Sequence, residues 1–114
     1  MNTEKIIEGN KLIAEFMGIK TKVYSDRPTI TRWKYGNSML YETDLKYHSS
    51  WDWLMPVIYK IESFGFSATI LDVGMCIAGK LIIERFGESK IEGTYYTIIE
   101  FIKWYNQQYN QQQP

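Results

Sequence analysis

Apolar side chains recur at helical spacing in three segments of this chain, separated by stretches in which that spacing disappears. The first segment runs from about Glu4 to Met17, and Gly18 stands where a left-handed residue commonly ends a helix. The second runs from Trp51 to Ile61, with a kink expected at Pro56. The third runs from Ser89 to Asn106. The pattern therefore predicts three amphipathic helices.

Residues that favour helix N-termini precede each of these segments. Thr3 is the expected cap of the first helix. Ser49 with Asp52, and Ser89 with Glu92, have the spacing of a capping box, in which a hydroxyl and a carboxylate satisfy each other's backbone N–H groups. We therefore expect Ser49 and Ser89 to cap the second and third helices.

The intervals between the helices are rich in β-branched and aromatic residues, which favour strands. Turn residues divide them, and Gly36-Asn37 in particular predicts a hairpin. The segments with strand composition are Val23–Tyr24, Ile30–Tyr35, Ser38–Tyr41, Phe66–Asp72 and Met75–Phe86. The last two, broken at Val73-Gly74 and Ala78-Gly79-Lys80, predict a meander of three short antiparallel strands.

The predicted order is one helix, a hairpin, a second helix, three strands and a third helix (α-ββ-α-βββ-α). Strands that are grouped in this way favour the α+β class with an antiparallel sheet over a doubly wound fold. At 114 residues the chain has room for one domain, which we assign to residues 1–106. Residues 107–114, mostly Gln and Asn, are expected to form a polar tail.

Composition removes several classes of function. Thirteen basic and thirteen acidic residues cancel, which argues against a dedicated nucleic-acid-binding protein. A single cysteine excludes an intrachain disulfide and a cysteine-rich metal site, so no metal and no cofactor is predicted. The longest apolar stretch, Phe64–Ile83, is interrupted by charges and glycines and does not predict a membrane span. We expect a soluble cytoplasmic protein.

A phosphate-binding loop is suggested by the glycine and lysine spacing of Gly74 to Lys80, which follows a predicted strand. However, Leu81 stands where a Ser or Thr hydroxyl would hold magnesium, and the following residues are too β-branched for the required helix. We interpret the segment as two strands joined by a glycine turn.

Catalytic groups are scarce. Cys76 lies in an apolar strand, where a thiol is usually a small core residue, and His48 lies near Asp44 with no nucleophile tied to it. An imidazole at the start of a helix could act as a general base, but a local hydrogen-bonding role is the more common one. No enzymatic activity is predicted.

One segment has an unusual charge. Between Lys20 and Tyr35 five basic residues stand against Asp26 alone, so this stretch carries about four positive charges, interleaved with aromatic residues. Cations beside aromatic faces suit a nucleotide-like anion, and the start of the second helix offers unpaired N–H donors. The candidate ligand-binding residues are Lys22, Arg27, Arg32, Trp33, Lys34, Tyr35, Tyr47, His48 and Ser50. The alternative is a hairpin with its charges on a solvated face.

The third helix has apolar residues on more than one face. Ile98 and Ile102 lie on its main stripe, whereas Tyr96 and Ile99 lie to the side. A face wider than one core stripe suggests a second contact surface, which predicts a homo-oligomer, most simply a symmetric dimer.

Three segments resemble small phage and prophage proteins of the ABA-sandwich type. They are Asn10–Gly18, Tyr47–Ser63, which contains the string Trp-Asp-Trp-Leu-Met-Pro, and Glu88–Asn106. The resemblance implies an antiparallel sheet sandwiched by helices. It also implies an accessory role, of which sequestration of a host nucleotide signal is one form. It supplies no catalytic residue.

The sequence therefore predicts a non-catalytic phage or prophage accessory protein that binds a nucleotide-like anionic ligand. The alternative is an interaction or assembly module that binds a host or phage polypeptide. Neither reading involves a membrane.

Overall fold

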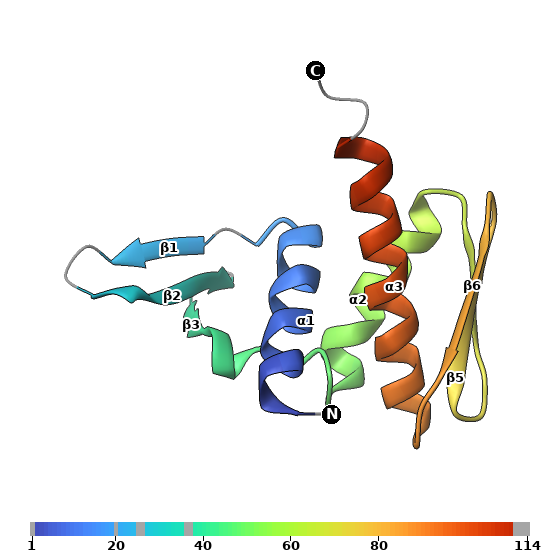
Figure 1. Ribbon diagram of the computed structural model, residues 1–114, viewed down its shortest axis with the longest axis horizontal. Helices are drawn as coiled ribbons and strands as arrows, with labels where there is room; N and C mark the ends of the chain where they lie inside the picture. Colours follow the sequence, from blue (N-terminus) through green and yellow to red (C-terminus); the bar gives the residue numbers. More distant parts are fainter. Residues whose placement is uncertain (1, 20, 25–26, 36–37, 111–114) are drawn as a thin grey trace. The chain divides into compact units, whose positions relative to one another are not determined.

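The computed structural model describes residues 2–19, 21–24, 27–35 and 38–110, and it places side chains in residues 2–19 and 43–108. Contacts within the chain divide it into two compact units, Met1–Lys46 and Tyr47–Pro114. Each unit has its own helices and its own three-stranded sheet (Figure 1). We describe them in turn.

The N-terminal unit begins with helix α1 (Thr3–Phe16). Its cap is Asn2 and not Thr3, because the Asn2 side chain accepts a hydrogen bond from the backbone N–H of Lys5 at 2.9 Å. An amide oxygen one residue earlier competes successfully for the free N–H groups of the first turn. The helix ends as predicted, with Gly18 in the left-handed region at φ 77°.

Three strands follow α1, namely β1 (Thr21–Tyr24), β2 (Arg27–Tyr35) and β3 (Ser38–Tyr41). Both neighbouring pairs are antiparallel, and β2 and β3 pair with Tyr35 opposite Ser38, which confirms the predicted hairpin. The segment Val23–Tyr24 forms part of β1, so this region holds three strands and not two. A short 3₁₀ helix, η1 (Glu42–Asp44), closes the unit.

A buried polar contact holds α1 to the segment that follows η1. Asn10 is buried, and its side-chain amide donates a hydrogen bond to the carbonyl oxygen of Leu45 at 3.0 Å. Leu45 is itself buried. The polar residue that interrupts the apolar face of α1 thus has a structural partner 35 residues further along the chain.

The C-terminal unit begins with helix α2 (Trp51–Ser63). Its cap is Ser50, whose side chain makes no capping hydrogen bond, so the predicted capping box of Ser49 and Asp52 is wrong. Helical backbone bonds to the Ser50 carbonyl set the start instead. Pro56 is accommodated inside the helix. Because proline has no N–H, the carbonyl of Asp52 loses its usual donor, but both residues are exposed to solvent.

Helix α2 is followed by the predicted meander: β4 (Ser67–Ile70), β5 (Gly74–Ala78) and β6 (Ile82–Phe86). The sheet order is β4-β5-β6, and both pairs are antiparallel. Most of the segment with phosphate-loop spacing is strand β5, and Gly79-Lys80-Leu81 forms the turn into β6. This confirms two strands and a glycine turn.

Helix α3 (Lys90–Asn110) lies along β5 and β6. Ser89 caps it as predicted, accepting a hydrogen bond from the N–H of Glu92 at 3.2 Å, while the Glu92 carboxylate accepts one from the N–H of Glu88. The helix runs four residues beyond Asn106, where the periodic pattern predicts its end. The helix can continue into this segment because glutamine is a good helix former and asparagine only a moderately poor one.

Small residues let α3 approach the sheet closely. A Cβ at Gly93 would lie 2.0 Å from the carbonyl oxygen of Val73 and 2.5 Å from the Cα of Gly74. One turn later the buried Thr97 hydroxyl accepts a hydrogen bond from the N–H of Arg85 at 3.1 Å and lies 3.1 Å from the carbonyl oxygen of Met75. The helix therefore contacts the backbone of two strands directly.

This packing explains why α3 has more than one apolar face. It contacts the sheet through one side, and it also contacts α2. Its buried residues are Gly93, Thr94, Tyr95, Thr97, Ile98, Phe101 and Ile102. Tyr96 and Ile99, from which the sequence suggests a second contact surface, are only half-buried, and the homo-oligomer stays a prediction.

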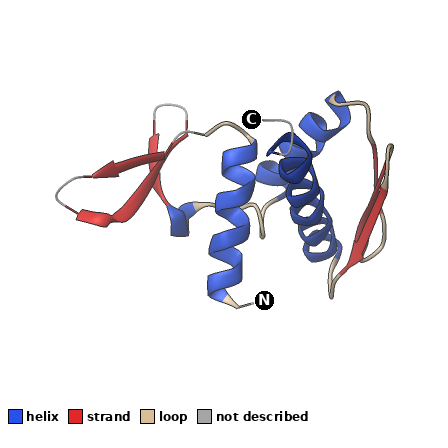
Figure 2. Ribbon diagram, turned by 45° about the horizontal axis from the view of Figure 1, so that its top comes forward, coloured by secondary structure: helices blue, strands red, loops and turns tan. Residues whose placement is uncertain are grey.

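The α+β class with antiparallel sheets is confirmed. In the C-terminal unit both helices lie on the same side of the sheet (Figures 1 and 2). The other side is open among the described residues, with Ile82 73% and Phe86 55% exposed. The sequence predicts helical layers on both faces of the sheet. Among the described residues, helices cover one face of the C-terminal sheet, and the β6 residues that point away from α3 are exposed to solvent.

Truncating the core and truncating the open face should have very different effects. Ile98 is fully buried, so Ile98→Ala should lower the free energy of unfolding by about 2–5 kcal/mol. Ile82→Ala, the same chemical change on the open face, should alter it by less than about 0.5 kcal/mol. Urea denaturation measures both. Equal effects from the two variants would contradict this assignment of the core.

Candidate functional site

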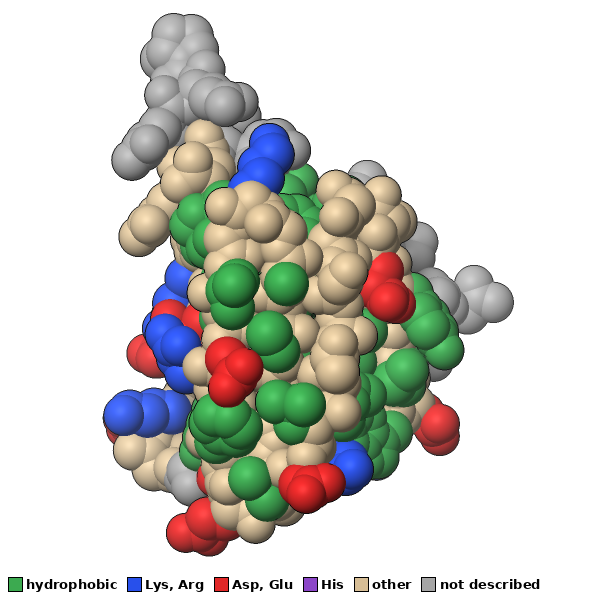
Figure 3. Space-filling model, turned by 90° about the vertical axis from the view of Figure 1, so that its right-hand side faces the viewer, with side chains coloured by type: hydrophobic (Ala, Val, Ile, Leu, Met, Phe, Trp, Pro, Cys, Tyr) green, Lys and Arg blue, Asp and Glu red, His purple; other side chains and the backbone are tan. Residues whose placement is uncertain are grey.

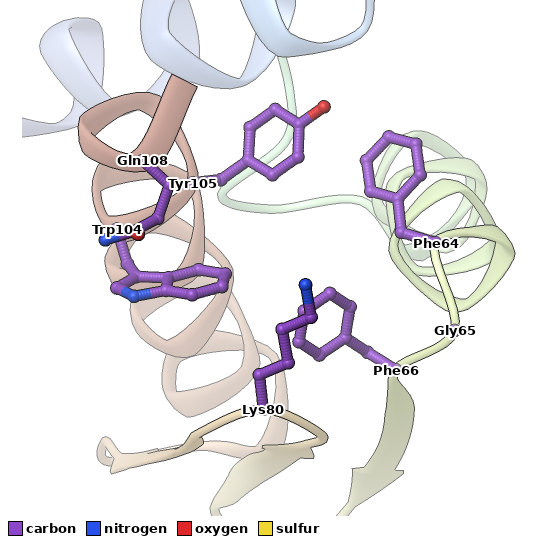
Figure 4. Close-up of a pocket in the computed structure, with 7 residues that line it drawn as sticks. All are labelled: Phe64, Gly65, Phe66, Lys80, Trp104, Tyr105 and Gln108. Carbon is purple, nitrogen blue, oxygen red and sulfur yellow. The ribbon is translucent and has the colours of Figure 1, made fainter. Parts of the chain in front are cut away.

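The C-terminal unit contains a pocket of about 270 Å³ whose walls are mainly aromatic (Figure 4). It lies at the end of the sheet where the turn between β5 and β6 meets the second half of α3. The residues that line it are Phe64, Gly65, Phe66, Lys80, Trp104, Tyr105 and Gln108. All of them belong to one unit, so the pocket is complete within it.

Three different parts of the chain supply these side chains. Phe64 and Phe66 flank Gly65, where α2 ends and the chain turns into β4. The Gly65 backbone has φ 95°, a value that non-glycine residues rarely adopt, and it places two successive aromatic side chains on the same pocket. Trp104 and Gln108 are four residues apart on α3 and therefore share one helix face.

The aromatic rings are held by contacts among themselves. Phe64 stacks on Tyr105 with ring centroids 5.2 Å apart and planes within 5° of parallel. Phe66 meets Trp104 edge to face, with centroids 5.9 Å apart. It meets the buried Phe101 in the same way, at 5.0 Å. Such pairs are worth about 0.5–1.5 kcal/mol each beyond the area they bury, so the walls are largely formed before any ligand arrives.

Gly79 makes room for one of these walls. A Cβ at this position would lie 2.5 Å from an edge carbon of the Phe66 ring. No other residue type would allow the ring to rest against the turn between β5 and β6 in this way. The glycine turn that resembles a phosphate loop in sequence therefore has a packing role.

Among the described residues that line the pocket, Lys80 is the only charged one. Its side chain rises from the turn between β5 and β6, and its ammonium group is directed toward the space between the rings (Figure 4). It is exposed, and among the described residues it has no ion pair. A cation at the rim of an aromatic pocket favours a ligand that combines a flat ring with a negative charge.

The described residues that line the pocket include no carboxylate, imidazole or thiol. Within the described part of the chain, no group of three or more His, Cys, Asp or Glu side chains is arranged to hold a metal ion. The groups that face the pocket can stack, donate hydrogen bonds and attract an anion. This set is suited to binding.

The candidate residues that were predicted from the charge pattern fall into two groups. Lys22 lies on β1, and Arg27 with Arg32, Trp33, Lys34 and Tyr35 lies on β2, all in the N-terminal unit. Lys22 is paired across the strands with Arg32. The side chains of these six residues lie outside those that the structure describes.

The other three candidates lie at the start of α2, where two of them pack against other rings. Tyr47 is buried and meets Trp53 edge to face, with centroids 5.2 Å apart. His48 is partly buried against the ring of Tyr95, 6.3 Å away between centroids. Ser50 is the helix cap. None of the three lines the pocket, and their described contacts are those of a packed helix start.

Cys76 differs from its predicted place in the core. It is half-buried on the open side of the sheet, paired across the strands with Glu84. Burial, with the neighbouring Glu84 carboxylate, raises the pKa of the Cys76 thiol. A raised pKa keeps the thiol protonated and lowers its nucleophilicity.

The pocket residues were not singled out from the sequence. Phe64, Phe66 and Trp104 appear there as apolar residues next to a turn or on a helix flank, and Lys80 as part of a misleading loop motif. A usable signal is the pair of phenylalanines around Gly65, because a left-handed glycine between two large apolar residues predicts that they are turned onto one surface.

No family model, curated protein or solved structure is significantly similar to this chain. No helix in the described part of the chain is both long enough and apolar enough to cross a membrane.

His48 provides a pH-dependent readout of the packing around α2. Burial lowers its pKa below the ordinary 6.5, so the folded protein favours the neutral ring. The unfolded chain therefore binds more protons between the two pKa values, and the free energy of unfolding should rise with pH up to about 6.5. His48 is the only histidine, so NMR titration should show one imidazole with a midpoint below 6.5.

The matched variant is His48→Gln, which cannot titrate in this range. It should remove the His48 contribution to the pH dependence of unfolding while leaving that of the carboxylates. A titration midpoint above 6.5 in the folded protein would contradict the burial of this ring.

Proposed function

We propose that this chain is a non-catalytic binding protein for a nucleotide-like anion, and that the ligand occupies the aromatic pocket of the C-terminal unit. The observation that carries the proposal is the joint presence, around a single space, of four aromatic rings and one ammonium group that has no ion pair with any described residue. Any of the nucleobases can stack on an aromatic side chain, and phosphates bind to cationic side chains.

The charge at the rim decides between two classes of ligand. Aromatic cages also bind quaternary ammonium groups, because ring faces are electronegative. Here Lys80 already directs an ammonium group toward the rings, so a second cation would be repelled. An anion would be attracted by Lys80 and would stack through an attached ring. Lys80 thus favours the anionic class.

A binding role is also favoured over catalysis by the groups available. General acid–base chemistry at neutral pH calls for an imidazole or a perturbed carboxyl group close to the reacting atom. The lining supplies neither. The resemblance of Asn10–Gly18, Tyr47–Ser63 and Glu88–Asn106 to phage accessory proteins would give such binding the role of removing a host nucleotide signal, and that part of the proposal depends on the resemblance alone.

Trp104 should contribute more to ligand binding than any surface aromatic residue. In titration calorimetry against mono-, di- and cyclic nucleotides, Trp104→Leu should weaken binding about tenfold or more, since stacking on one base is worth about 1–3 kcal/mol. Trp104→Phe, which keeps a ring, should recover part of the loss. Tyr59→Leu is the matched control, because Tyr59 is 61% exposed and lies outside the pocket.

Absence of heat with every nucleotide, together with an intact fold, would overturn the proposed ligand. Equal weakening by Trp104→Leu and Tyr59→Leu would show that binding occurs elsewhere in the chain. The basic segment between Lys20 and Tyr35 would then be the next region to test.

A second candidate function, an interaction module, is favoured by the open side of the C-terminal sheet. Figure 3 views the molecule from this side and shows hydrophobic side chains gathered over the strands. On β6, Ile82 and Phe86 flank the Glu84 carboxylate. Charge complementarity points to a polypeptide segment that presents apolar residues around one basic residue.

Cys76 allows a direct test of this second candidate, because its half-buried thiol lies on the same side of the sheet. A thiol-linked photo-crosslinker on Cys76 should capture a peptide with a basic residue between apolar ones, and Ile82→Ser should abolish the capture. Trp104→Leu should leave it unchanged. Capture of this chain's own peptides would indicate self-association and would contradict a foreign partner.

A further inference from the structure

We propose that the pocket recognises one nucleobase and one phosphate of a nucleoside phosphate, so that further phosphates add little to binding. This inference depends on the proposed nucleotide-like ligand and specifies its class. It follows from the size of the pocket, the number of its charges and the position of its only amide side chain.

The size of the pocket limits the ligand to a single base. Its volume of about 270 Å³ lies just below the range of roughly 300–1,000 Å³ that is typical of sites for drug-sized ligands. Phe64 and Tyr105 are already stacked on each other at 5.2 Å, so their facing surfaces are not open to a second ring. A dinucleotide would have to leave one base outside.

The charge of the pocket limits recognition to one phosphate. Among the described residues that line it, Lys80 is the only cation, and the remaining side-chain donors are neutral: the Trp104 indole N–H, the Tyr105 hydroxyl and the Gln108 amide. A first phosphate can pair with the Lys80 ammonium group. A second or third phosphate finds no second cation among the described lining residues, and its attraction to the same exposed lysine is weak in water because of the high dielectric constant.

Gln108 can orient the base without adding charge. It lies one helical turn beyond Trp104, on the same face of α3, and no described contact occupies its amide. A carboxamide offers both donors and an acceptor, which match the edge of a nucleobase. One base and one phosphate can make all three contacts. The base stacks on Trp104 and meets Gln108 with its edge, and the phosphate pairs with Lys80.

The experiment is titration calorimetry of the full chain at 150 mM salt with adenosine, AMP, ADP, ATP and the single-ring anion 4-hydroxybenzoate. AMP should bind about tenfold more tightly than adenosine, and ADP and ATP should stay within about threefold of AMP. Lys80→Met should remove the difference between AMP and adenosine. Lys103→Met is the matched control, because Lys103 is an exposed lysine of α3 that pairs with Glu100 and lies outside the pocket.

The outcomes separate this inference from the proposed function. Affinity that rises more than threefold with each added phosphate, or a loss that is equal in Lys80→Met and Lys103→Met, would overturn recognition of a single phosphate by Lys80 and leave a nucleotide-binding protein. Tighter binding of 4-hydroxybenzoate than of AMP would show that a carboxylate is preferred to a phosphate. No heat with any ligand would overturn both proposals. Circular dichroism and thermal melting establish that each variant is folded.

Discussion

The architecture of the C-terminal unit depends on the close contact between α3 and the start of β5. Because Gly93 has no side chain, the helix can lie directly on the Val73 carbonyl and the Gly74 Cα. Thr97 then links the helix to the backbone of β5 and β6 by hydrogen bonds that no apolar side chain could make. A helix seated on backbone atoms has little freedom to slide or rotate, because backbone cannot repack as side chains do.

The position of the pocket follows from this contact between α3 and the start of β5. Eleven residues of helix separate Gly93 from Trp104, a rise of about 16 Å. Five residues of strand separate Gly74 from Gly79, a rise of about 17 Å. The contact of α3 with the start of β5 therefore brings Trp104 to the other end of the β5–β6 hairpin, where Gly79 and Lys80 form the turn. Phe64 and Phe66 complete the site, since Gly65 ends α2 at the same end of the sheet.

The same arrangement leaves the sheet covered on one side only. Residues that alternate along β5 and β6 are divided between the face under α3, with Met75, Ile77 and Ile83 buried, and the opposite face, with Ile82 and Phe86 exposed. Cys76 lies on this open face beside Glu84 and is for that reason not a core thiol. The packing of α3 on one face of the sheet thus creates both candidate surfaces. The ligand pocket lies at the end of the sheet, and the proposed polypeptide site is the face opposite α3.

Much of the fold is determined by the sequence alone, because periodicity and turn chemistry act locally. The three helices, the hairpin at Gly36-Asn37, the meander from Ser67 to Phe86 and the Ser89 cap all follow from residues close in the chain. The caps at Asn2 and Ser50 were each misplaced by one residue, in α1 because the Asn2 amide oxygen takes the first-turn N–H, and in α2 because backbone bonds to the Ser50 carbonyl set the start without a side-chain cap. The pocket could not be predicted in this way. Its walls come from three segments up to 44 residues apart, and only the seating of α3 on the backbone of the sheet brings them together.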